Sequence, residues 1–216
     1  MQPTTLRPFA SEADKQERRE LIAQLRNAPP EALLAMSEEA VAPAFQRAYA
    51  RVPAYRQLVQ QHGVLGDPAE VTTIAEFLRV APLLDKHNTF AVYPIRELCL
   101  DGNLDGVRSV LTSSGHSGVF SFGVNTADNI EVSAQSIDMV LQYFIGVDER
   151  STLLINCLPM GVKFNTRAAV VAETSVHDGM VYALIEKLKD DFDQIVLFGE
   201  NSFIKKIIED GQNTTE

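Results

Sequence analysis

Two uninterrupted apolar runs in the second half of the chain constrain its fold more than any other feature. Ser151–Cys157 and Gln194–Gly199 are rich in Leu, Ile and Val, and Met180–Lys189 between them has helical spacing of apolar residues. A further helix is predicted from Asp128 to Gly146, and another over Arg167–Glu173. Strands that are apolar on both sides need cover on both faces, which is typical of a parallel sheet between helices. The sequence therefore predicts an α/β fold.

The first hundred residues have a different character and predict helices without a parallel sheet. Helices are predicted over residues 11–27, from Glu31 to a break or kink at Pro43, over residues 53–62, and over residues 74–78 with Thr73 as the cap. We therefore divide the chain into an N-terminal helical region, residues 1–106, and an α/β subdomain, residues 107–216. The two are expected to form parts of one continuous domain.

A loop rich in glycine and hydroxyl side chains, Thr112–Gly118, lies near the start of this subdomain. Its seven residues are Thr112, Ser113, Ser114, Gly115, His116, Ser117 and Gly118. A β-type run precedes it, and Phe120, Phe122 and Val124 alternate with polar residues after it, so it is predicted to join two strands. Backbone N–H groups and hydroxyls in such a loop can close on an anion. A Gly/Ser hairpin turn without a ligand is the alternative.

The better-known phosphate loops do not match this segment. A Walker A loop needs a lysine directly after its second glycine, whereas Val119 follows Gly118 here and no lysine is close in sequence. The dinucleotide fingerprint G-x-G-x-x-G is also absent.

Composition and charge narrow the possible partners. The chain has 216 residues, 45% of them hydrophobic, and a formal net charge of -10, which argues against nucleic acid or an anionic membrane as the main partner. No apolar run is long enough to span a bilayer, and residues 1–20 lack a signal-peptide pattern. Cys99 and Cys157 have no metal-ligand spacing, so we expect a reducing, cytoplasmic location.

Four segments of the chain follow one another in an informative order. Val52–Arg56 has the form of a short P-x-Y-R helix start, and Phe77–Lys86 that of an E-F…P…K connector. Thr112–Gly118 is similar to a T-S-S-G-T-T-G loop, and Leu153–Cys157 is followed by Pro159, Met160 and Gly161 in a turn. In this order the segments resemble the N-terminal portion of the adenylate-forming enzymes, specifically the phenylacetate–CoA ligase and acyl-protein synthetase branch, in which the loop is the phosphate loop and the strand and M-G turn lie beside the acyl pocket.

The resemblance implies ATP-dependent activation of a carboxylic acid to an acyl-adenylate, followed by thioester formation, with CoA as one acyl acceptor. ATP and Mg²⁺ are the implied cofactors. By resemblance, residues 112–118 hold the ATP phosphates and Met160 and Gly161 line the acyl pocket; otherwise Met160 and Gly161 form a turn. The fold implied is part of a parallel-sheet adenylating-enzyme core.

The chain also departs from the family pattern. His116 stands where the family has Ser or Thr, Val119-Phe120 replaces a frequent Lys-Pro, and no Y-G-x-T-E run occurs, whose Glu is the usual Mg²⁺ ligand. We therefore expect an incomplete enzyme that is inactive by itself and either self-associates or lacks a C-terminal half. Two alternatives stay open: a non-catalytic subunit or scaffold remnant that needs a partner, and an acyl-protein synthetase component of a fatty-acid reductase.

Two further candidates have simpler structural explanations. Cys157 could accept an acyl group, but a cysteine within an apolar strand is expected to be a buried structural residue. His177-Asp178 could form a catalytic pair, but a polar turn in which Asp178 caps the next helix is the favoured interpretation.

Overall fold

The protein is described by a computed structural model that covers residues 10–63, 68–115, 118–159 and 162–213. The chain folds into two compact units. The sheet unit comprises Met1–Gln24 and Asp128–Glu216, and the helical unit comprises Leu25–Ala127. The sequence placed the division at residue 107 instead. The segment after residue 107 joins the helical unit because Ser113 contacts Lys86 and Phe122 contacts Phe90.

A three-stranded parallel sheet forms the centre of the sheet unit. Its strands are β3 (Thr152–Asn156), β4 (Val170–Glu173) and β5 (Gln194–Phe198), in the order β4-β3-β5. Leu153 of β3 lies opposite Val170 on one side and Ile195 on the other. All five residues of β3 are buried. The predicted α/β fold with a parallel sheet is confirmed.

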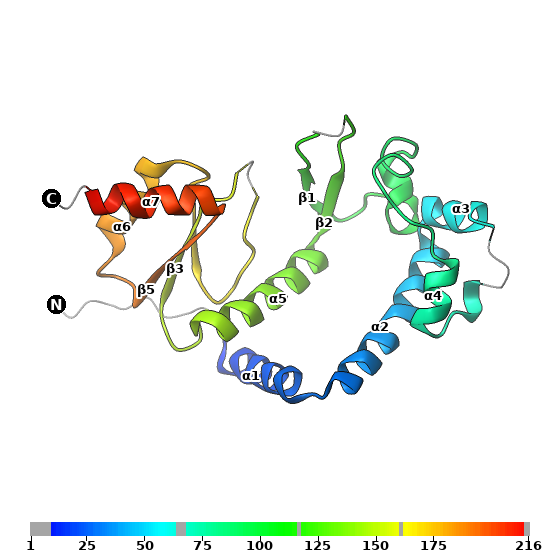
Figure 1. Cartoon of the computed structure of the whole chain (residues 1–216), viewed down its shortest axis with the longest axis horizontal. Coiled ribbons are helices and arrows are strands. Elements are labelled where there is room, and N and C mark those ends of the chain that lie inside the picture. The colour runs from blue at the N-terminus through cyan, green and yellow to red at the C-terminus, as the bar shows by residue number, and fades with distance from the viewer. Residues whose placement is uncertain (1–9, 64–67, 116–117, 160–161, 214–216) are drawn as a thin grey trace. The chain divides into compact units, whose positions relative to one another are not determined.

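Helices cover both faces of this sheet, as the apolar strands required. The helices of the unit are α5 (Ala127–Ile145), α6 (Asp178–Leu188), α7 (Asn201–Asn213) and most of α1 (Glu12–Asn27). Alternate residues of a strand point to opposite faces. Leu153 and Ile155 accordingly pack with α6 and α7, which lie beside β3 and β5 in Figure 1, while Leu154 packs with Leu141 of α5.

Several predicted elements differ from the structure. The helix predicted over Arg167–Glu173 is wrong, because strand β4 occupies Val170–Glu173 and pairs with β3. Helix α7 continues past Gly211 to Asn213, although glycine is a common helix end. Pro43 lies inside helix α2 (Pro30–Arg51), so of the predicted break or kink at that residue, the break is wrong. For Val170–Glu173, pairing with β3 overrides the local helical preference.

A buried ion cluster holds α1 in the sheet unit. The guanidinium of Arg18 donates two hydrogen bonds to Asp148, Nη2 to Oδ1 at 2.7 Å and Nε to Oδ2 at 3.2 Å. Its Nη1 lies 3.6 Å from Oδ2 of Asp138 on α5. All three residues are buried. Burial by itself would lower the pKa of Arg18, but the hydrogen bond and charge of Asp148 outweigh that effect and raise the pKa.

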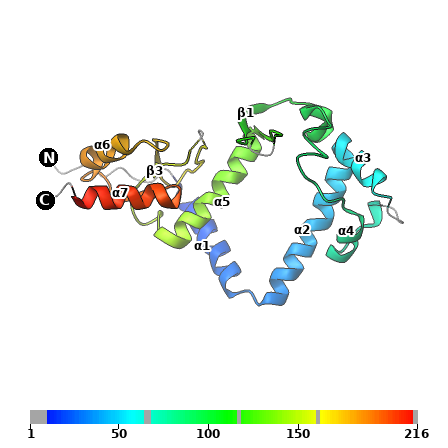
Figure 2. The ribbon, with the colours of Figure 1, turned by 45° about the horizontal axis from the view of Figure 1, so that its top comes forward.

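The helical unit is built from α2, α3 (Pro53–Gln61) and α4 (Ile74–Val80), which lie together in both views (Figures 1 and 2). Phe45 of α2 is at the centre of its core, with the rings of Tyr49, Tyr55 and Phe77 around it at centroid distances of 5.6–6.2 Å. No helix in the described part of the chain is long and apolar enough to cross a membrane.

A capping box fixes the start of α4, as the sequence predicted for Thr73. The Thr73 hydroxyl accepts from the Glu76 N–H at 3.2 Å, and the Glu76 carboxylate accepts from the Thr73 N–H at 3.0 Å. Replacing Thr73 with alanine is expected to lower the free energy of unfolding by about 1 kcal/mol. Urea denaturation measures this change. Ser37→Ala is the control, since the Ser37 hydroxyl only donates to Leu33 O within α2; equal losses in both variants would contradict the capping role.

Candidate functional site

A β-hairpin presents the glycine-rich loop, as the flanking residues predicted. Strand β1 (Val107–Thr112) pairs antiparallel with β2 (Phe122–Thr126), and Thr112 lies opposite Phe122 at the last pair before the loop. The hairpin is extended by one further bond, in which the Ser113 N–H donates to Ser121 O at 3.0 Å. The base of the loop is therefore closed by backbone pairing.

The two glycines give the loop its shape. Gly115 has φ +71° and Gly118 has φ +79°, the left-handed region that favours glycine, and the Gly118 N–H donates to Gly115 O at 2.9 Å. A Cβ atom added to Gly115 would lie 2.6 Å from Cε1 of Phe120. The Phe120 ring thus packs directly against the backbone of Gly115. His116 and Ser117, two of the predicted phosphate-binding residues, lie outside the described residues.

The hydroxyl of Ser113 is held on two sides. It accepts a hydrogen bond from the Ser121 N–H at 3.0 Å and another from Nζ of Lys86 at 3.2 Å. Thr112 and Ser114 are exposed beside it. The structure therefore brings together the described residues of the predicted loop and adds a cation to them.

Lys86 is the functional candidate that the sequence analysis missed. It precedes Ser113 by 27 residues, so a search for a lysine next to the loop does not find it. Lys86 ends the segment that resembles the E-F…P…K connector, and this was the available signal. Only the tertiary contact shows that the connector delivers its lysine to the loop.

The second predicted site lies at the carboxyl end of β3, in the sheet unit. Met160 and Gly161 lie outside the described residues. Before them, the side-chain amide of Asn156 donates to Val162 O and to the Glu173 carboxylate, both at 2.6 Å. The rings of Phe164 and Phe198 pack edge to face, with their centroids 4.6 Å apart. Ligands of parallel α/β sheets often bind at this edge of the sheet.

The two other candidates have structural roles. Cys157 is fully buried, and burial raises the pKa of its thiol, so little of it is the reactive thiolate. Nδ1 of His177 accepts the Met180 N–H at 3.3 Å and caps α6. The prediction that Asp178 is the cap is wrong, because its carboxylate pairs with Nζ of Lys206 at 2.6 Å.

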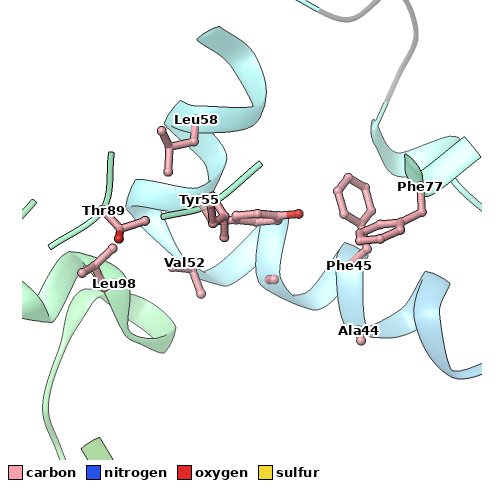
Figure 3. Close-up of a pocket in the computed structure, with 10 residues that line it drawn as sticks. Ala44, Phe45, Val52, Tyr55, Leu58, Phe77, Thr89 and Leu98 are labelled. Atoms are coloured by element: carbon pink, nitrogen blue, oxygen red, sulfur yellow. The ribbon is translucent and has the colours of Figure 1, made fainter. Parts of the chain in front are cut away.

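The helical unit also contains an apolar pocket of about 390 Å³ (Figure 3). It opens between α2, α3 and α4, and Leu84, Thr89 and Leu98 complete its wall. Its polar lining groups are the hydroxyls of Tyr55, whose pKa burial raises, and of Thr89, which donates to Asp85 O. No lining side chain is charged, so the pocket has nothing to neutralise a carboxylate. Two of its lining residues, Leu84 and Thr89, lie shortly before and shortly after Lys86 in the sequence.

Within the described ranges, no group of three or more His, Cys, Asp or Glu side chains is placed to hold a metal ion. The predicted Mg²⁺ thus has no ligand set among these residues, and we assign it no residue.

Comparison with known proteins places the fold. No protein-family model matches the sequence, and no curated protein matches it. Among solved structures, a 2-hydroxyisobutyryl-CoA ligase in an open conformation, in complex with 2-HIB-AMP and CoA, is similar with a TM-score of 0.59 at 12% identity. The match covers 96% of this chain and 45% of the ligase chain, so the chain spans less than half the length of that ligase. The described structure therefore has the fold of part of an acyl-CoA ligase.

Proposed function

We propose that this chain is the phosphate-binding part of an ATP-dependent carboxylate-activating enzyme of the adenylate-forming class. The observation that carries the proposal is the hairpin loop: two left-handed glycines, a clamped Ser113 and the ammonium of Lys86 meet there. The likeness of the fold to a ligase bound to an acyl-AMP and CoA supports it independently. The finer assignment, to the phenylacetate–CoA ligase branch, rests on the four sequence segments.

Each element of the loop has a defined task in this proposal. The glycines let the backbone of the loop approach phosphate oxygens closely. Lys86 supplies positive charge at Ser113, whereas the family often has a lysine directly after the second glycine. This local charge matters because the chain as a whole has a net charge of -10 and repels polyanions at long range.

In this class the triphosphate supplies an activated α-phosphate for the carboxylate and a pyrophosphate leaving group. Donors fixed before the reaction stabilise the charge that develops on that leaving group without reorganisation. We assign this chain's loop to that task. We propose the carboxyl edge of β3 as the region for the acid, and a thiol such as that of CoA as the acceptor.

Calorimetric titration tests the binding step with three probes: ATP, inorganic tripolyphosphate and adenosine. We expect ATP and tripolyphosphate to bind and adenosine not to bind measurably. Lys86→Gln is expected to weaken tripolyphosphate binding about fivefold to tenfold, because a charge-assisted contact is lost. Lys189→Gln, which removes an exposed lysine from the sheet unit, is the control. Absence of heat with both phosphate probes would refute the proposal.

The same titration distinguishes the proposed function from the alternative one. Val119-Phe120 in place of Lys-Pro favours a non-catalytic subunit or scaffold, which predicts that neither phosphate probe binds. If ATP binds, carboxylate-dependent exchange of labelled pyrophosphate into ATP is the next measurement. Exchange by this chain alone would show that it is a complete catalyst, contrary to our expectation.

A further inference from the structure

Lys86 lies in a turn whose backbone is fixed from several directions. Asp85 and Asn88 bond each other reciprocally: the Asp85 N–H donates to Oδ1 of Asn88, and the Asn88 N–H donates to Oδ1 of Asp85, both at 2.9 Å. The same Asp85 oxygen accepts the His87 N–H at 2.8 Å. The Asn88 amide donates to Leu83 O at 2.8 Å. The two side chains thus bracket Lys86.

The far side of this turn is anchored in the helical unit. Thr89 is buried, and its hydroxyl donates back to Asp85 O across Lys86. Thr89 lines the apolar pocket together with Val52 and Leu98 (Figure 3). The Ala91 N–H donates to Lys86 O at 3.0 Å. The backbone of Lys86 is therefore held both by side chains and by packing.

A turn of this kind needs no lysine for its own stability, because every bond that fixes it comes from Asp85, Asn88, Thr89 or the backbone. The Lys86 side chain instead leaves the turn and reaches Ser113 at the base of the glycine-rich loop. Ordering a lysine side chain costs conformational entropy. Because the backbone of Lys86 is already fixed, no additional backbone entropy is lost when its side chain is ordered.

We propose that Asp85 and Asn88 are positioning residues that aim Lys86 at the loop, so that its ammonium is already in place when a polyphosphate binds. The inference rests on the proposed function. The role is indirect: neither residue is assigned a contact with the ligand, and each acts through the backbone of Lys86.

Charge gives this inference a test that separates positioning from electrostatics. If Asp85 acted only through its negative charge, removing the carboxylate would strengthen the binding of an anion. Positioning predicts the opposite sign. Asp85→Ala is therefore expected to weaken tripolyphosphate binding about threefold to tenfold, whereas Asp85→Asn, which keeps the accepting oxygen, is expected to retain an affinity close to that of the wild type.

A double-mutant cycle with tripolyphosphate as the probe completes the experiment. Because Asp85 acts through Lys86, the double variant Asp85→Ala/Lys86→Gln is expected to bind as Lys86→Gln alone does. Additive losses, or equal or tighter binding by Asp85→Ala, would overturn the inference while leaving the proposed function intact. No binding by the wild-type chain would instead overturn the proposed function, and this inference with it. Far-UV circular dichroism verifies that each variant is folded.

Discussion

Replacing Arg18 with alanine is expected to lower the free energy of unfolding by about 3–5 kcal/mol. The substitution leaves the buried carboxylate of Asp148 without the two hydrogen bonds it receives from Arg18, at 2.7 and 3.2 Å. It also removes the cation 3.6 Å from Asp138, which is 1% exposed. An uncompensated buried charge costs more than the pair gains. Urea denaturation followed by circular dichroism measures the loss.

The adjacent residue provides a matched control. Arg19 pairs with Glu149 at 3.1 Å, but both side chains are about half exposed, at 44% and 52%. Solvent screens such a pair, so Arg19→Ala is expected to cost at most about 1 kcal/mol. If the two variants lost the same stability, the buried cluster would not be what anchors α1.

Gly115→Val is expected to weaken tripolyphosphate binding by about tenfold to a hundredfold, which corresponds to about 1.4–2.8 kcal/mol. A side chain at φ +71° is strained, by roughly 1–2 kcal/mol for an ordinary residue. Its Cβ would lie 2.6 Å from the Phe120 ring, so the ring must move away and would no longer pack against the backbone of the loop. Isothermal titration calorimetry measures the affinity.

Gly63→Val separates strain from site geometry. Gly63 has φ +70°, nearly the same value, but an added Cβ meets no atom within 4 Å, and the residue follows α3 away from the hairpin. This variant is expected to lose similar stability while it binds tripolyphosphate as the wild type does. Comparable loss of binding in both variants would mean that general destabilisation, rather than the loop, controls affinity.

Much of the fold was predictable because its signals are local. Strands β3 and β5 were predicted from continuous apolar runs, and α5 and α6 from helical spacing, each within a few residues. The hairpin followed from a β-type run before the loop and period-2 alternation after it. Strand β4 was missed because Val170–Glu173 is only four residues long, and its state depends on pairing with β3 rather than on its own composition.

The glycine-rich loop illustrates the same division for the candidate site. Its residue types by themselves indicated a turn that can bind an anion, because glycine and hydroxyl side chains act through short-range backbone geometry. The register of the hairpin, the Phe120 ring against Gly115, and the contact of Lys86 with Ser113 were not predictable. They join residues through packing, which no local pattern encodes.

The sequence by itself determined a parallel α/β sheet, a helical region and a glycine-rich loop between two strands, since each depends on interactions within a few residues. Only the tertiary structure decided which distant residues complete them: Arg18 lies 130 positions before Asp148, and Lys86 lies 27 before Ser113. Such pairs form where the folded chain brings charges together, and there burial and fixed geometry give them their strength.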